Sequence, residues 1–184
     1  MATTTTPISA EQFLAIDEPG SRLELIAGEI RRMSPAGPDH GDIAMQFAWR
    51  IAQYVTLNQL GKVYAAETGF ILSRNPDTVR APDVSFVAKA RVPAGKTRGF
   101  FSGPPDLAVE VLSPNDSVGE VGEKVGDWLD ADTRVVIVIN PSLSDVTLYR
   151  SRTDIRVFTG EDRLELPDLV PGWSISVAEI FAEG

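Results

Sequence analysis

The chain has 184 residues, of which 43% are hydrophobic and 23% charged, a composition typical of a globular domain and unlike a disordered, fibrous or disulfide-rich protein. It has no cysteine and a single histidine, so a bound metal would need oxygen ligands or His40, which favours a hard cation such as Mg²⁺ or Mn²⁺. The formal net charge of −9 argues against a high-affinity, non-specific nucleic-acid binder, although the local charge can differ from the total.

The length and the beginning of the chain indicate one domain. A chain of about 150 residues buries about 70% of its unfolded surface, so we expect a flexible N-terminus over residues 1–8 and a single domain over residues 9–184. No run of about 18 apolar residues is present, and the start, "MATTTTPIS", lacks the basic and apolar regions of a signal peptide. We therefore expect a cytoplasmic protein without a membrane segment.

The first third of the chain predicts a short helix, a hairpin and a long helix. Ser9 and Gln12 have the spacing of a capping box, so a helix is expected over "SAEQFLAI". The stretch "SRLELIAGEIRRMSP" predicts two short strands that form a hairpin. Apolar residues at helical spacing then predict a helix that begins at Asp39 or His40 and is ended by Gly61.

From Lys62 onward the pattern predicts a series of short strands. The β-rich segments are "KVYAAETGFIL", "APDVSFVA", "PDLAVEVLS", "TRVVIVINP", "DVTLYR" and "DIRVFTG". One helix, "SVGEVGEKVGDWLDAD", interrupts them, and its apolar stripe is expected to include Val118, Val125 and Trp128. The tail is expected to close an edge with a short helix or strand. This order of elements predicts an α/β or α+β domain with a mixed sheet flanked by helices.

Two predicted strands carry an acid where an apolar residue is expected. Alternation places Glu110 on one face with Ala108, and it places Asp83 on one face with Ser85 and Val87. On adjacent strands, opposed side chains have Cβ atoms about 4.5 to 5.5 Å apart, so the two carboxylates could converge. Two anions in a low-dielectric site need a compensating cation or proton, and a divalent metal is the natural candidate. The alternative is that each acid faces solvent or forms an ion pair.

Lys124 differs from the acidic residues around it on the predicted helix. At 3.6 residues per turn it lies about 40° from Trp128, at the border of the apolar stripe. It could therefore face a site, or it could bury its stem and keep its ammonium group in water.

The segment between the two acids, "AKARVPAGKTRGFFSGPP", contains four basic residues and no acidic one. Connections longer than about 12 residues are often functional. A basic loop beside a carboxylate pair suits a phosphate-bearing substrate, and a mobile surface loop is the alternative. Phe100 and Phe101 are expected to anchor its base in the core.

Several segments of the chain resemble, in order, the motifs of the Uma2 family of endonucleases. These segments are "LELIAGEI", "SPAGPDHGDIA", "RAPDVSFVAKAR", "GPPDLAVEVLSPND", "GEKVGDWLDAD" and "VVIVINP". This family belongs to the PD-(D/E)xK superfamily, so the resemblance implies a restriction-endonuclease-like fold. It covers the chain from about residue 13 to the C-terminus. Ile137 and Asn140 depart from the family pattern at positions where tryptophan and aspartate often occur.

The resemblance also implies a set of site residues. Asp83 and Glu110 would bind the metal, Mg²⁺ or Mn²⁺. In the superfamily pattern, a lysine lies two positions after the second acid, where this chain has a leucine. In the Uma2 family this lysine has moved to the following helix, and Lys124 matches that position. Glu24 and His40 match further family positions and would complete the site.

The resulting hypothesis is a metal-dependent endonuclease that hydrolyses DNA phosphodiester bonds. Related nucleases commonly dimerise, so we expect a homodimer. One alternative is a non-catalytic nucleic-acid or protein-binding module on a nuclease scaffold. Another is a metal-dependent hydrolase that acts on a small phosphate ester.

Overall fold

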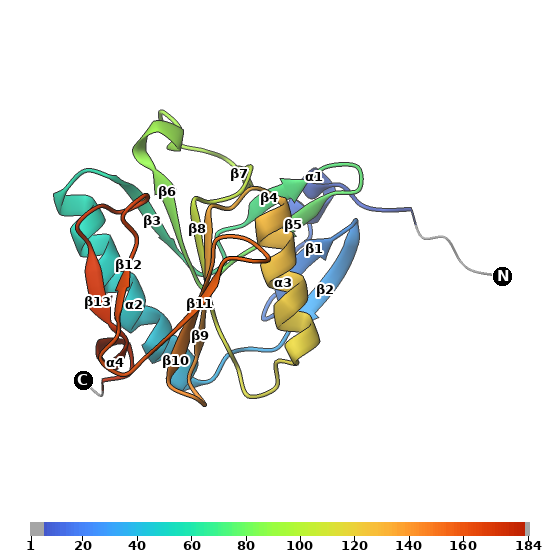
Figure 1. Ribbon diagram of the computed structural model, residues 1–184. Helices are drawn as coiled ribbons and strands as arrows, with labels where there is room; N and C mark the ends of the chain where they lie inside the picture. The colour runs from blue at the N-terminus through green and yellow to red at the C-terminus, as the bar shows by residue number, and fades with distance from the viewer. Residues whose placement is uncertain (1–5, 183–184) are drawn as a thin grey trace.

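The computed structural model of the chain describes residues 6–182, which have a mixed α/β fold (Figure 1). Residues 1–5, which make up most of the expected flexible N-terminus, lie outside the described residues. Within residues 6–182 no helix combines the length and the apolar character needed to cross a membrane.

The strands form three sheets. The five-stranded sheet has the order β2-β1-β5-β4-β7, with β1 Arg22–Ile26, β2 Glu29–Met33, β4 Phe70–Ser73, β5 Thr78–Arg80 and β7 Phe101–Ser102. The six-stranded sheet has the order β11-β10-β9-β8-β6-β3, with β3 Gly61–Ala65, β6 Val84–Ala88, β8 Leu107–Val111, β9 Val135–Asn140, β10 Asp145–Tyr149 and β11 Ile155–Thr159. The third sheet pairs β12 Arg163–Glu165 with β13 Ser174–Ser176.

Both larger sheets are mixed, because β4 pairs with β7 and β8 pairs with β9 in parallel while their other pairs are antiparallel. The predicted class, a mixed sheet flanked by helices, is confirmed. The division of the strands among several sheets was not apparent from the sequence.

The helices are α1 Ala10–Leu14, α2 Pro38–Leu57, α3 Val118–Asp130 and α4 Val177–Ile180, with a 3₁₀ turn η1 at Lys89–Arg91. The capping box predicted for α1 is present, and so is the predicted hairpin of β1 and β2. The tail contains both predicted alternatives, since β13 leads directly into α4.

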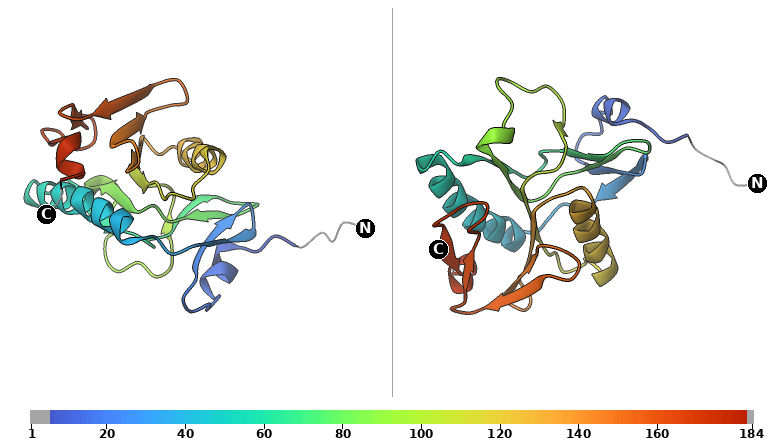
Figure 2. Two further views of the ribbon diagram at one scale, coloured as in Figure 1. Left: turned by 90° about the horizontal axis from the view of Figure 1, so that it is seen from below. Right: turned by 45° about the horizontal axis from the view of Figure 1, so that its top comes forward.

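The six-stranded sheet is covered on both faces. On one face, α2 contributes Phe47, Ile51 and Val55, which recur every four residues. They pack in one core with alternate residues of the strands, which are Val84 and Phe86 of β6 and Leu107 and Val109 of β8. On the other face, Trp128 of α3 packs with Phe70, Ala108 and Val136. Figures 1 and 2 show α2 and α3 on opposite sides of these strands.

Two details of the predicted helices are wrong. The long helix ends at Leu57, and Gly61 instead begins β3, where an added Cβ would clash with the Val87 carbonyl oxygen. Glycine is therefore needed there for the close approach of β3 to β6. Val118 was expected in the apolar stripe of α3, but it is 93% exposed because the first turn of the helix extends past the core.

The chain crosses between the two large sheets at residues 81–83. Arg80 ends β5 of the five-stranded sheet, and Val84 begins β6 of the six-stranded sheet. Asp83 lies at this junction, directly after Pro82, which cannot donate a hydrogen bond to a sheet. The junction brings β1, the start of α2 and α3 close to one acid.

Candidate active site

Asp83 directly precedes β6 and lies close to Glu110 of the neighbouring antiparallel strand β8. In the pairing of β6 with β8, Val84 lies across from Val109, and one further step along both strands places Asp83 across from Glu110. Both carboxylates are buried, with 6% of each side chain exposed. The structure thus brings together the two acids that strand alternation had singled out.

Glu110 lies deepest in the site. Trp128 Nε1 donates a hydrogen bond of 2.9 Å to its Oε1, and Lys124 Nζ lies 3.4 Å from its Oε2. Burial, with repulsion from Asp83 and Glu24, raises the pKa of Glu110 to about 7, against the lowering effects of Lys124 and Trp128. The carboxyl group therefore holds a proton more readily than an ordinary glutamate and would be stabilised as an anion by an added cation.

Lys124 projects from α3 into the site. Burial alone would lower its pKa, but the carboxylates of Glu110, Glu24, Asp83 and Asp116 together raise the pKa above its usual value. Its side chain is 21% exposed, as expected for a residue at the border of the apolar stripe. Lys124 is therefore an ammonium group at neutral pH.

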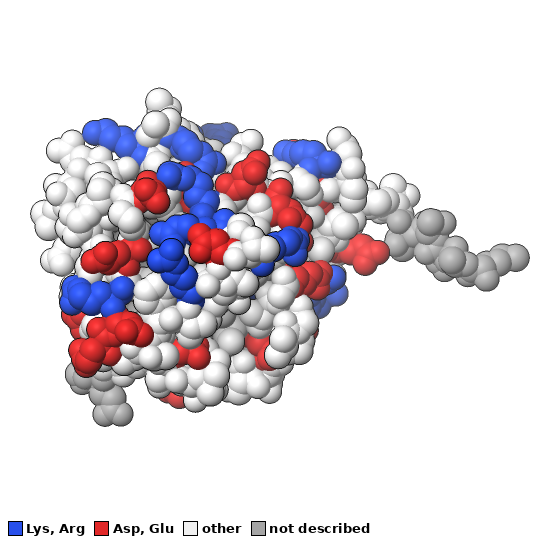
Figure 3. All heavy atoms as spheres, in the orientation of Figure 1, with Lys and Arg blue, Asp and Glu red and all other residues white. Residues whose placement is uncertain are grey.

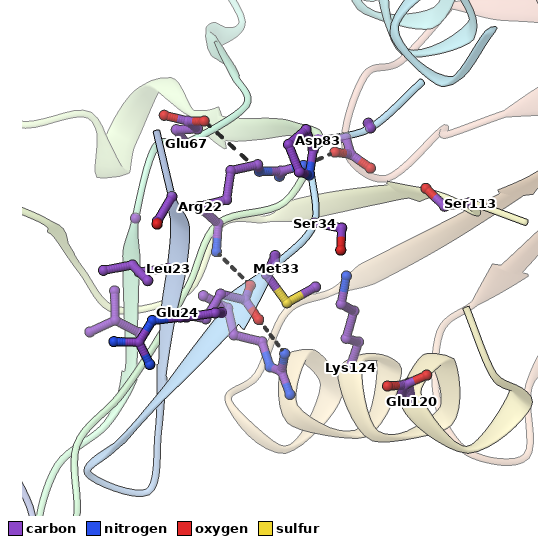
Figure 4. Close-up of a pocket in the computed structure, with 18 of the residues that line it drawn as sticks. Arg22, Leu23, Glu24, Met33, Ser34, Glu67, Asp83, Ser113, Glu120 and Lys124 are labelled. Atoms are coloured by element: carbon purple, nitrogen blue, oxygen red, sulfur yellow. Dashed lines mark hydrogen bonds and ion pairs between the residues drawn. The ribbon is translucent and has the colours of Figure 1, made fainter. Parts of the chain in front are cut away.

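Asp83 is surrounded by cationic partners and donors. Its Oδ2 accepts a hydrogen bond of 2.9 Å from the Val111 N–H and lies 3.1 Å from His40 Nε2, while Arg22 Nη2 lies 3.6 Å from Oδ1. Figure 4 shows Arg22 between Asp83 and Glu67. Burial would raise the pKa of Asp83, but these hydrogen bonds and charges hold it below its usual value. Asp83 is therefore an anion.

His40 reaches Asp83 from the first turn of α2. Its hydrogen bond to Asp83 raises the pKa of His40 above its usual value, although burial and the charge of Arg22 oppose the shift. The pairing links the beginning of α2 to the junction of the sheets. Sequence analysis had given His40 no partner.

Glu24 of β1 is joined to α3 through a buried arginine. Its Oε2 accepts a hydrogen bond of 2.7 Å from Arg80 Nη1, and its Oε1 accepts one of 3.3 Å from the Ala81 N–H. Arg80, with 2% of its side chain exposed, also donates through Nε to Asp127 Oδ2 at 2.7 Å. Because α3 carries both Asp127 and Lys124, this chain of ion pairs ties the N-terminal hairpin to the helix that presents the lysine.

An open cavity of about 610 Å³ lies over these groups. Glu24, His40, Asp83 and Lys124 line it, and Glu110 lies just beneath, in contact with Lys124. Figure 4 shows Lys124 extending from α3 towards the middle of the cavity, with Glu24 and Asp83 on the opposite side. Four of the five residues expected at the site thus line one cavity, which we call the acid cavity, and the fifth, Glu110, is connected to it through Lys124.

The donor set suits a hard divalent cation. Among residues 6–182, no three His, Asp or Glu side chains are arranged as a complete metal-ligand set. Mg²⁺, however, is usually bound by one or two carboxylates and completes its shell with water and substrate oxygens. Asp83 and Glu110 supply two such carboxylates, and burial with the repulsion from Asp83 and Glu24 keeps the pKa of Glu110 raised despite Lys124, so a bound cation would favour its ionised form. These two residues therefore fit a Mg²⁺ site.

The basic segment after β6 lies away from the acid pair. Asp83 precedes β6 and the segment follows it, so five strand residues, roughly 16 Å, separate them. Arg91 and Arg98 line a different cavity, and from residues 89–105 only Phe100 lines the acid cavity. The expectation of a whole loop beside the carboxylates is wrong for this reason. The expected anchoring is found, since Phe101 is buried.

Sequence analysis did not identify Arg22, Arg80 or Trp128 as parts of the site. A signal existed for Trp128, since it lies four residues after Lys124 and therefore on the same side of the helix. Arg22 and Arg80 gave no comparable local signal, because their partners are distant in the sequence.

The fold and the site together define a class of protein. Helices cover both faces of a mixed sheet, and two buried acids and a lysine meet at one end of neighbouring strands beside an open cavity. This is the arrangement expected of a restriction-endonuclease-like domain. The model of the Uma2 family, described as "Putative restriction endonuclease", matches residues 10–178, and the chain belongs to this family.

A solved structure supports the same fold. The crystal structure titled "putative nuclease belonging to DUF820", from Anabaena variabilis ATCC 29413, superposes with a TM-score of 0.84 at 23% sequence identity. The match covers 95% of this chain and 98% of the other. No curated protein matches the sequence. The predicted family and fold are confirmed.

Proposed function

We propose that this protein is a Mg²⁺-dependent endonuclease that hydrolyses phosphodiester bonds in DNA. The observation that carries the proposal is the meeting of Asp83 and Glu110 across β6 and β8, with Lys124 Nζ 3.4 Å from Glu110. Membership of a family described as a restriction endonuclease supports a nucleic-acid substrate.

Asp83 and Glu110 would hold the cation. Once bound, Mg²⁺ supplies charge stabilisation at the scissile phosphate and lowers the pKa of a coordinated water. Asp83 suits this role because it is already ionised, whereas Glu110 would release its proton as the cation binds. Cation binding should therefore become tighter as the pH rises through about 7.

Lys124 would act as a hydrogen-bond donor and a fixed positive charge. With its pKa raised by four carboxylates, it can orient the attacking water or offset negative charge that develops on the phosphate. It would not remove the proton from that water while its carboxylate neighbours remain charged.

His40 and Glu24 would support these groups. His40 keeps Asp83 ionised and oriented through the contact at 3.1 Å. Glu24 holds Arg80, which holds α3 through Asp127, so Glu24 would act by positioning Lys124.

The decisive experiment is plasmid cleavage by purified protein in Mg²⁺, with EDTA as the blank. Asp83→Asn and Glu110→Gln should abolish cleavage while circular dichroism shows a folded chain. Glu161→Gln is the matched control, because Glu161 is exposed and forms no ion pair within the described residues. Retained cleavage in either site variant would refute the proposal.

Two further measurements separate the alternatives. Calorimetry with Mn²⁺ should show binding that Glu110→Gln removes, whereas a non-catalytic module would show no such binding. Plasmid should be cleaved in preference to a chromogenic phosphodiester, and the reverse order would indicate a small-ester hydrolase.

The proposal includes a homodimer, since cutting both strands of a duplex calls for two active sites. Analytical ultracentrifugation should show a species of twice the mass of the chain. A monomer at all protein concentrations used for cleavage would contradict this part.

A further inference from the structure

A second cavity of about 610 Å³ adjoins the acid cavity. Its lining includes Arg74, Arg91 and Arg98, and it shares Leu14 and Phe100 with the acid cavity. The second cavity, called here the basic cavity, lies among α1, β4, β7 and the segment between β6 and β7. The shared residues form one apolar ridge between the two hollows.

The segment between β6 and β7, part of which lines the basic cavity, has a charge opposite to that of the chain as a whole. Residues 89–105 contain Lys89, Arg91, Lys96 and Arg98 and no acidic residue, in a chain whose net charge is −9. In Figure 3, Lys and Arg side chains gather toward the upper edge of the molecule, where Figure 1 places the β6–β7 segment. This segment thus carries positive charge, although β6 separates it from the two acids and only its Phe100 reaches the lining of the acid cavity.

The arginines of the basic cavity differ in how they are held. Arg74 is bound by Asp77 and Glu11, and Arg91 lies 3.1 Å from Asp106. These two are fixed by acids and contribute little net charge. Among residues 6–182, no ion pair or side-chain hydrogen bond involves Arg98, which is exposed and lines the cavity.

Lys96, two residues before Arg98, is likewise exposed and has no ion pair within the same described residues. Both cations are therefore available to an anionic ligand.

The ridge between the cavities is apolar and firmly supported. The ring of Phe100 stacks on Phe13 with centroids 5.5 Å apart, and Leu14 beside it is 52% exposed. An apolar ridge of this kind offers a surface to a nucleobase, while Lys96 and Arg98 on the side of the basic cavity offer positive charge to the backbone. A polynucleotide presents these chemical groups in alternation.

We propose that the basic cavity and the exposed segment beside it bind phosphates flanking the scissile bond of a DNA strand, with Arg98 of the cavity lining and Lys96, two residues earlier, as the phosphate contacts and the Leu14–Phe100 ridge beneath a base. The inference rests on the proposed function, because the position of the scissile bond in the acid cavity sets the direction of the strand. The strand runs from the acid cavity over the ridge into the basic cavity.

The test is fluorescence anisotropy of a labelled DNA duplex in EDTA, titrated with protein at a series of salt concentrations. The double variant Lys96→Gln/Arg98→Gln should bind more weakly, and the slope of log affinity against log salt should fall by about 0.9 for each phosphate that the variant no longer neutralises. The matched control is Arg152→Gln, which removes an exposed arginine from the connection between β10 and β11. Its slope should equal that of the unchanged protein.

An unchanged slope in the double variant, or an equal fall in Arg152→Gln, would overturn the proposal. Glu110→Gln, measured in the same way, should keep the full slope. This binding experiment involves neither a metal nor cleavage. If the unchanged protein failed to cleave plasmid, the proposed enzymatic activity would be refuted, and the anisotropy experiment would still test the binding surface. Steady-state cleavage by the double variant should show a raised KM with kcat retained.

Discussion

Replacing Glu110 by glutamine should make the protein more stable at alkaline pH while it removes the proposed activity. The carboxylate of Glu110 is buried, lies across from Asp83 and has only Lys124 and Trp128 as direct side-chain partners within the described residues. Burial and like charge raise its pKa to about 7, from an ordinary value of 4.5. Folding therefore favours the protonated form of this residue.

The sign and size of the effect follow from the two pKa values. A raised pKa stabilises the folded state fully below pH 4.5, and this contribution is lost as the pH rises from 4.5 through about 7. At about 1.4 kcal/mol for each pH unit between them, the loss is about 3 kcal/mol. The pKa of about 7 already includes the attraction of Lys124, which lowers the pKa of Glu110. Above pH 8, replacing Glu110 by the neutral glutamine should therefore regain much of the lost free energy of unfolding.

Urea unfolding from pH 5 to pH 8.5 checks the reasoning. The free energy of unfolding of Glu110→Gln should exceed that of the unchanged protein at pH 8.5, and the two should approach each other near pH 5. Glu161→Gln should follow the unchanged protein throughout, because Glu161 is exposed. If Glu110→Gln were no more stable at pH 8.5, the idea of a destabilising carboxylate at the site would be refuted.

Three other changes probe the same cluster. Trp128→Phe removes the 2.9 Å hydrogen bond to Glu110, so it should lower the free energy of unfolding by about 2 kcal/mol, measured by urea unfolding. It should also raise the pKa of Glu110 further, measured by carboxyl ¹³C NMR, and an unchanged pKa would contradict this. Arg22→Gln removes a cation 3.6 Å from Asp83, so Mn²⁺ should bind more tightly by calorimetry, and weaker binding would show that Arg22 instead supports the site. Because the pKa of His40 is raised, its pairing with Asp83 stabilises the protein below pH 6.5, and this contribution is lost as the pH rises through the pKa of His40 in the folded state. In urea unfolding, His40→Gln should therefore lose stability mainly at low pH. An equal loss at pH 9 would rule out a charge effect.

Local sequence patterns predicted most elements of the fold and the positions of the key side chains upon them. Strand alternation placed Glu110 with Ala108 and Asp83 with Ser85, opposite the faces that pack on α2, because successive strand residues point to opposite sides. Helical phase placed Lys124 at the edge of the stripe on α3. These predictions succeeded because each depends on a repeat a few residues long.

Predictions that depended on distant contacts did less well. The basic segment was expected beside the acids, but β6 carries it to the opposite end of the strand. Gly61 was interpreted as a helix terminator, whereas its role is the close approach to Val87 on a neighbouring strand. In both cases the deciding neighbour is a separate part of the chain.

The sequence by itself determined the family, most of the helices and strands, and which faces Asp83, Glu110 and Lys124 occupy. Only the tertiary structure decided that β6 pairs with β8 in the register that sets the two acids close together, and that Arg80 joins Glu24 to α3. The physical reason is that periodicity follows from the backbone geometry of each segment. Register and ion pairing depend on how segments far apart in the chain bury their apolar surfaces together.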